Sequence, residues 1–162
     1  MTKQKGSVLG FHPAAYGFGW VLFESNQMLL DWGTFDAQGR ANASCLQKLE
    51  TILEKYRPKT LVIEAFDDAR SKRHDRVKAL CRDVIRDAKA RKIETRVVSR
   101  DRIAAALGAP SYSSREQIAE IVAGLVDALQ PELPRHRQVW EGERWGLAMF
   151  SAAACVLASQ PK

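Results

Sequence analysis

Val8-Leu9-Gly10-Phe11-His12-Pro13 is an apolar, β-prone stretch, and Gly19 and the run Trp20-Val21-Leu22-Phe23-Glu24 follow it across a short loop. This pattern predicts a strand, a tight turn and a second strand. A third predicted strand over residues 27–36 follows the polar pair Ser25-Asn26. Because the turns between the three strands are short, we expect them to form an antiparallel meander.

Beyond the meander, helical and strand patterns alternate. Apolar residues at helical spacing predict a helix over 42–56, and the nearly continuous apolar run 60–66 predicts a strand buried on both faces. The same criteria predict a helix over 71–91, a strand over 94–99, helices over 102–107 and 115–129, a proline-rich connector over 131–139 and a final helix over 143–159. This order predicts an α/β fold with a mixed five-stranded sheet flanked by helices.

Length and composition restrict the class of protein. The 162 residues, 46% of them apolar, suit a single domain spanning 1–162. The net charge of +6 favours a polyanionic partner. The three cysteines are far apart and lack Cys-x-x-Cys spacing, so neither a zinc ribbon nor a disulfide framework is indicated. Cys81 and Cys155 fall on apolar helix faces, and we expect them to pack in the core. With no signal peptide and no apolar run of about 18 residues, we expect a cytoplasmic protein without a membrane partner.

Two motifs in the predicted strands carry a family resemblance. The chain resembles a ribonuclease H-like domain and, within that superfamily, the RuvC-type Holliday junction resolvases. Their first strand runs into Asp-Pro-Gly, and a glycine follows a few residues later. Residues 8–14 and Gly19 match this motif, but His12 takes the place of the aspartate. Their second motif is an apolar strand that ends in glutamate, which matches Leu61-Val62-Ile63-Glu64.

Two further motifs extend the resemblance over nearly the whole chain. Residues 102–108 and 114–118 are similar to the family's short helix, glycine and following helix start. The family's last motif is an acid on a terminal helix, followed by alanine-rich apolar residues. Residues 150–157 match that motif, with Ser151 in place of the acid. The resemblance implies the ribonuclease H-like fold and a homodimer.

The resemblance also implies a nuclease site with two divalent metal ions held by several acids. Mg²⁺ prefers carboxylate oxygens, and here only Glu64 is an acid at a matching position, since His12 and Ser151 replace two others. We therefore predict a nucleic-acid-binding, RuvC-like protein whose metal-dependent phosphodiester cleavage is weak or lost. Mg²⁺ or Mn²⁺ is the implied cofactor if the protein is active, and otherwise none is needed.

Two alternative functions stay open. Glu143 lies eight residues before Ser151, about two helical turns, so both could share one side of the last helix. An active junction endonuclease would then hold its metal with His12, Glu64 and Glu143, and a histidine nitrogen also suits Mn²⁺ or Zn²⁺. In the simpler interpretation, His12 hydrogen-bonds to Glu64 or to the backbone. The second alternative is a protein-interaction module with no role in nucleic acid binding.

The most basic part of the chain is residues 69–92, which contain ten Lys or Arg and three Asp, a net charge of +7. Apolar residues at helical spacing predict that one side of this helix faces the core. The opposite side is expected to contact phosphates, although a solvated face with Asp–Arg pairs is the plainer alternative. The residues assigned to this contact are Lys78, Arg82, Arg86, Lys89 and Arg73.

Aromatic residues beside the first turn suggest a contact with bases. Tyr16 and Phe18 are candidates to stack on a base exposed in a junction or single strand. Phe11 and Trp20 lie within strands, and we expect them to pack in the core. The predicted partner is therefore branched or single-stranded DNA, or structured RNA.

Overall fold

The computed structural model shows one sheet with helices on both of its faces. It describes residues 6–14, 16–24, 28–37, 42–66, 75–110, 113–133 and 146–160. The strands are β1 (Ser7–Ala14), β2 (Gly17–Glu24), β3 (Leu29–Asp36), β4 (Thr60–Glu64) and β5 (Glu94–Val98). The helices are α1 (Asn42–Tyr56), α2 (Asp75–Ala90), α3 (Arg100–Leu107), α4 (Arg115–Leu125) and α5 (Gly146–Ser159), and a 3₁₀ helix, η1 (Asp127–Glu132), follows α4.

The sheet has the strand order β3-β2-β1-β4-β5. The pairs β1–β2 and β2–β3 are antiparallel, whereas β4 pairs in parallel with both β1 and β5. β4 is buried along Thr60–Ile63, as expected for a strand that lies between two neighbours and is covered on both faces. The predicted α/β fold, with a mixed five-stranded sheet and three antiparallel strands first, is confirmed.

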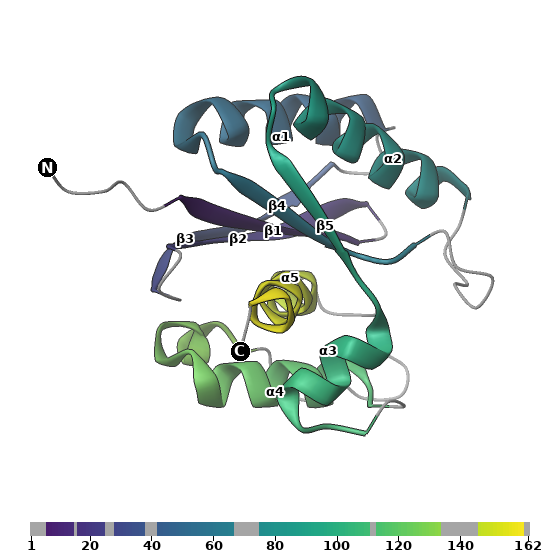
Figure 1. Cartoon of the computed structure of the whole chain (residues 1–162). Coiled ribbons are helices and arrows are strands. Elements are labelled where there is room, and N and C mark those ends of the chain that lie inside the picture. Colours follow the sequence, from purple (N-terminus) through teal and green to yellow (C-terminus); the bar gives the residue numbers. More distant parts are fainter. Residues whose placement is uncertain are drawn as a thin grey trace, which may run out of the picture.

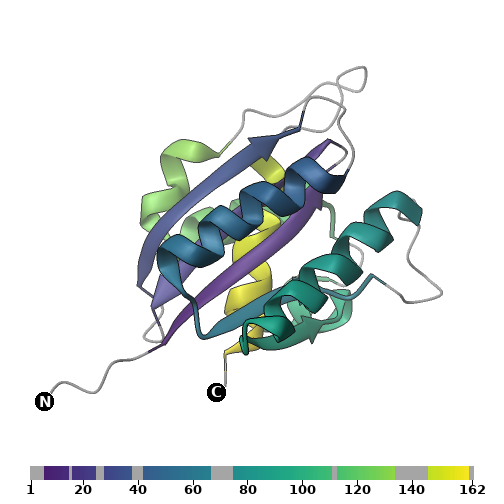
Figure 2. The ribbon, with the colours of Figure 1, turned by 90° about the horizontal axis from the view of Figure 1, so that it is seen from above.

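Helices form layers on the two faces of the sheet (Figure 1, Figure 2). α1 and α2 cover one face, while α5 lies against the other with α3 and α4 beyond it (Figure 1). Two clusters of buried residues fill the spaces between the layers. One cluster includes Leu9 and Leu80 on the α1 and α2 side, and the other includes Val21 and Phe150 on the α5 side.

Two strand glycines let α5 approach the sheet closely. A Cβ on Gly19 would lie 2.3 Å from the backbone nitrogen of Met149, and one on Gly10 would lie 2.5 Å from the carbonyl oxygen of Ala152. Because no larger residue leaves room for this approach, the glycines fix the distance between the helix and the strands. The contacts also show that α5 runs opposite to β1, since Gly19 pairs with His12 further along that strand.

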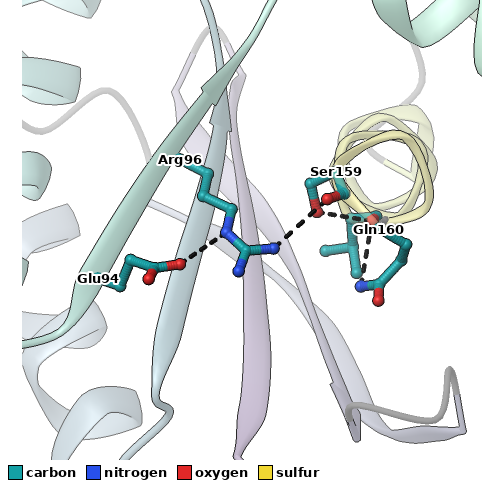
Figure 3. Close-up of polar contacts among 5 residues, drawn as sticks. Glu94, Arg96, Ser159 and Gln160 are labelled. Atoms are coloured by element: carbon teal, nitrogen blue, oxygen red, sulfur yellow. Dashed lines mark hydrogen bonds and ion pairs between the residues drawn. The ribbon is translucent and has the colours of Figure 1, made fainter. Parts of the chain in front are cut away.

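Polar contacts hold the far end of α5 against β5 (Figure 3). Arg96 donates from Nε to Glu94 Oε1 at 2.7 Å and from Nη1 to the Ser159 carbonyl oxygen at 3.4 Å. The Ser159 hydroxyl donates to the Val156 carbonyl oxygen at 2.8 Å. The last turn of α5 is thereby fixed near the middle of β5, which leaves Ser151 at the carboxyl ends of the parallel strands.

Helix boundaries differ from the predictions where tertiary packing decides them. α3 begins at Arg100, two residues early, because the Ser99 hydroxyl caps it by accepting from the Arg102 amide at 3.1 Å. The prediction of one helix over 115–129 is wrong, because α4 ends at Leu125. The 3₁₀ helix that follows contains Pro131 and places Leu129 in the core, with no exposed surface.

Several side-chain predictions are confirmed. Cys81 and Cys155 are buried free thiols, and Phe11 and Trp20 lie in the core. Burial raises the pKa of the third thiol, Cys45, and the nearby Arg76 opposes this rise. Among the described residues, no helix combines the length and apolar character that a membrane crossing requires.

Candidate functional site

Two strand ends bring His12 and Glu64 together. β1 and β4 are parallel neighbours, and Phe11 pairs with Ile63, so the next residue on each strand lies at the same edge of the sheet. His12 Nδ1 lies 3.9 Å from Glu64 Oε1, within the range of an ion pair but longer than a hydrogen bond. The His12 side chain is 1% exposed and that of Glu64 is 17% exposed. The two side chains are close enough for an electrostatic interaction, but at this distance the hydrogen bond predicted between the two residues does not form between Nδ1 and Oε1.

α5 adds the third predicted position. Ser151 is buried on α5, and it lines the same hollow as Glu64. The close contacts of α5 at Gly10 and Gly19 place this part of the helix over β1 and β2. The structure therefore brings His12, Glu64 and Ser151 to one end of the sheet. Glu143, the other predicted site residue, lies outside the described residues.

The hollow also contains two arginines that the sequence analysis did not assign to the site. Its volume is about 30 Å³, and its lining consists of Glu64, Arg100, Ile103, Ala104, Pro110, Ser113, Arg115, Ile118, Ser151 and Ala154. Arg100 and Arg115 are the first residues of α3 and α4, and each follows a capping serine. The repeated Ser-Arg pair at two helix starts was the signal available in the sequence.

Within the described residues, the donor set does not fit the two-metal site that the resemblance implies. Mg²⁺ is held in proteins mainly by carboxylates and phosphate oxygens. Within the described ranges, no group of three or more His, Cys, Asp or Glu side chains could hold a metal ion. The lining of the hollow includes one acidic residue, Glu64, and two arginines, Arg100 and Arg115. The arrangement thus favours an anion over a divalent cation.

α2 carries the predicted basic face. Its apolar residues Val77, Leu80, Cys81, Val84 and Ala88 are buried against the sheet. Arg82, Arg86 and Lys89 are exposed on the helix, and Lys78 is half-buried. Arg86 forms an ion pair with Asp83, which agrees in part with the solvated alternative. Arg73 lies outside the described residues.

The two aromatic candidates differ in position. Tyr16 is 54% exposed in the turn between β1 and β2, beside the strand end that carries His12. Phe18 has no exposed surface, and its ring centroid lies 4.9 Å from that of Phe11 and 5.6 Å from that of Phe35. The hypothesis that Phe18 stacks on a base is therefore wrong, because core rings occupy its faces.

Comparisons with known proteins rest on structure alone. No protein-family model matches the sequence, and neither does any curated protein. The structure of RuvC from Thermus thermophilus matches with a TM-score of 0.62 and 16% identity, over 94% of this chain and 92% of that chain. T. thermophilus RuvC in complex with Holliday junction substrate matches with a TM-score of 0.65 and 14% identity, over the same shares.

A third structure comes from another organism. The yeast mitochondrial Holliday junction resolvase Ydc2 matches with a TM-score of 0.60 and 13% identity, over 98% of this chain and 79% of that chain. All three matches extend over nearly the whole chain, so they include the five-stranded sheet and α5. The protein therefore has a RuvC-like fold of the ribonuclease H-like type.

Proposed function

We propose that this protein binds branched or single-stranded nucleic acid and that its metal-dependent phosphodiester cleavage is weak or lost. The observation that carries the proposal is the composition of the strand-end site, where, among the described residues, Glu64 is accompanied by His12 and Ser151 rather than by further acids. A two-metal nuclease needs several carboxylates to neutralise its ions. A site of this composition retains a place for the nucleic acid but lacks most of the metal ligands.

The basic face of α2 supports the binding part of the proposal. Lys78 and Lys89 are eleven residues apart, which corresponds to about 16 Å along the helix. A row of cations over this length can meet several phosphates of one strand, and each neutralised phosphate strengthens binding at low salt. The T. thermophilus RuvC structure that holds Holliday junction substrate makes branched DNA the first substrate to test, with structured RNA as the second.

A charge-reversal experiment tests the binding. We expect the Arg82→Glu, Arg86→Glu, Lys89→Glu variant to bind a four-way junction and single-stranded DNA at least about tenfold more weakly at low salt. The slope of log affinity against log salt should also become shallower, by about 0.9 for each phosphate that the protein no longer neutralises. The measurement is fluorescence anisotropy over a salt series.

A matched control separates specific interactions from net charge. The Lys48→Glu, Lys55→Glu, Lys59→Glu variant changes the total charge by the same amount at exposed positions on α1 and beside β4. It should keep most of the affinity. Equal weakening in both variants would show that α2 contributes only through the net charge of the protein. If the wild-type protein binds no nucleic acid at low salt, the result would favour the protein-interaction module.

The homodimer implied by the resemblance remains part of the proposal. Two copies would present two strand-end sites to a branched substrate. Multi-angle light scattering of the free protein and of its junction complex measures the number of chains. A complex with one chain for each junction would contradict the dimer while leaving nucleic-acid binding intact.

A further inference from the structure

The hollow beside Glu64 has a polar lining of unusual composition for a metal nuclease. Its polar side chains are two guanidinium groups (Arg100 and Arg115), two hydroxyls (Ser113 and Ser151) and the Glu64 carboxylate. The formal charges of this lining sum to +1 at neutral pH. Since the rest of the lining is apolar, an ion in the hollow would be only partly hydrated, and the sign of this charge would select an anion.

Local structure fixes both arginines. Arg100 Nη2 donates to the Ser113 carbonyl oxygen at 3.0 Å, which holds the guanidinium across the start of α4. A guanidinium has five N–H donors, so this bond occupies only one of them. Arg115 begins α4 directly after a capping box, in which Ser114 and Gln117 each bond the other's backbone amide. The helix starts thus hold the two side chains at one hollow.

Ser151 provides a second, independent observation. Ser151 is 7% exposed and lines the hollow from α5, a third helix besides α3 and α4. A serine hydroxyl can donate one hydrogen bond and accept others. Ser151 therefore adds a hydrogen-bonding group to the hollow, and an oxygen atom bound beside the arginines could accept from it.

We propose that this hollow binds a phosphate group without any divalent metal, with Arg100 and Arg115 providing the positive charge that metal ions provide in a two-metal nuclease. Guanidinium groups match phosphate oxygens in geometry as well as in charge. The volume of about 30 Å³ has room for about two water molecules, so phosphate oxygens enter it while the remainder of the group lies at the mouth beside exposed Arg100.

This inference rests on the proposed function, since a nucleic-acid backbone is one source of the phosphate. A free phosphate ion or a small phosphate ester would present the same oxygens. Glu64 lines the hollow, and His12 Nδ1 lies 3.9 Å from its Oε1. The two arginines of the lining oppose the repulsion between the Glu64 carboxylate and a phosphate.

An NMR titration of the whole chain with inorganic phosphate in EDTA tests the site, with chloride at equal ionic strength as the reference. We expect saturable shifts of the Ser113, Arg115 and Ser151 amides. Arg100→Gln, Arg115→Gln and Ser151→Ala should each weaken binding, the arginine variants by about tenfold or more. Arg102→Gln is the matched control, because Arg102 is exposed on α3 and does not line the hollow.

The outcomes separate this inference from the proposed function. Absence of saturable shifts in EDTA, or shifts that require added Mg²⁺, would overturn the phosphate site, and so would equal weakening in Arg102→Gln. Junction binding through α2 could survive that result. If single-stranded DNA shifts the same amide signals, the phosphate group that binds in the hollow comes from a nucleic-acid backbone. If inorganic phosphate shifts them and DNA does not, the phosphate site is supported, and its ligand is a free phosphate group.

Discussion

Among the individual residues, His12 and Glu64 form the centre of the candidate site. A carboxylate at the end of a buried strand needs a partner, because burial without one is costly. The imidazole of His12 lies within 3.9 Å, and two arginines line the hollow that Glu64 faces. The neighbours of Glu64 are therefore cationic or polar side chains, at the position where a two-metal nuclease would hold its metal ions.

Restoring acids tests whether only the ligands are missing. We expect the His12→Asp, Ser151→Asp variant to gain Mg²⁺- or Mn²⁺-dependent cleavage of junction or flap substrates, because three carboxylates would then meet at the strand ends. Without metal the variant should be less stable, since two buried positions would carry unpaired charge. Gel assays of labelled substrates measure the cleavage.

The control for this variant adds Glu64→Gln, which should abolish any new cleavage. Wild-type protein should leave the same substrates intact. Strong cleavage by the wild type would instead support the endonuclease alternative with Glu143 as a ligand. A folded acid variant that cuts nothing would show that more than the ligands has changed.

Gly19 offers a second test at a single position. Gly19→Ala should lower the free energy of unfolding by about 1–3 kcal/mol, because its Cβ would lie 2.3 Å from the Met149 backbone nitrogen. Gly124→Ala is the control, since nothing lies within 4 Å of its Cβ in α4. That change should stabilise by about 0.5–1 kcal/mol. Urea denaturation measures both, and a neutral Gly19→Ala would contradict the close packing of α5.

Among the helices and strands, α2 and α5 have opposite charge patterns. α5 has no charged residue from Gly146 to Ser159, as suits a helix between the sheet and two further helices. α2 buries one side and leaves its cations on the other. Position in the layers explains this contrast, and it leaves α2 as the outer helix available to a polyanion.

The contact of α1 with β3 gives a prediction on pH. Tyr56 at the end of α1 donates a hydrogen bond to Asp31 of β3, and this bond, with some burial, raises the tyrosine pKa above its ordinary value of 10.0. A raised pKa means that the folded state holds the proton more tightly. The stabilisation is therefore complete below about pH 10 and is lost as the pH rises through the folded pKa.

Tyr56→Phe should consequently destabilise by about 1 kcal/mol at pH 8 and by less at pH 11. Urea denaturation at the two pH values measures the difference. The ring contact with Trp20, at 6.0 Å between centroids, should persist in the variant and limit any change in packing. An equal effect at both pH values would contradict the role of the hydroxyl group.

In the molecule as a whole, one sheet separates two cores. Leu80 belongs to the cluster between the sheet and α1 and α2, whereas Val122 belongs to the cluster on the α5 side. Both side chains are buried, and the strands contribute alternate residues to the two clusters. Disruption of one core would uncover one face of the sheet. The other core packs against the opposite face of the same sheet, so it would lose stability as well.

We therefore expect the chain to unfold as one domain. Leu80→Ala should lower the free energy of unfolding by about 2–5 kcal/mol, and Val122→Ala should lower it by a smaller amount. Both variants should keep a single transition, with equal calorimetric and van't Hoff enthalpies. Two separate transitions in either variant would show that the two layers fold independently.

Local sequence patterns were enough to predict the order of elements, the mixed sheet and the amphipathic α2, because these features depend on periodicity that neighbouring residues set. The candidates His12, Glu64 and Ser151 came instead from the resemblance of their motifs to those of the resolvases. The end of α4 was missed because burial of Leu129 decides it, and Phe18 was misplaced because an apolar strand does not reveal how fully its rings are covered.

The surroundings of Glu64, by contrast, depend on tertiary packing. Arg100 and Arg115 are far from it in sequence, and they reach the hollow because β5 lies beside β4 and leads into α3, while α4 packs beyond α5. Arg115 lies in the matched motif 114–118 and Arg100 begins α3, but neither position showed in the sequence that its side chain lies near Glu64. Convergence of charges depends on which strands are neighbours and how closely α5 approaches them, and those distances are fixed by packing between layers rather than by local sequence.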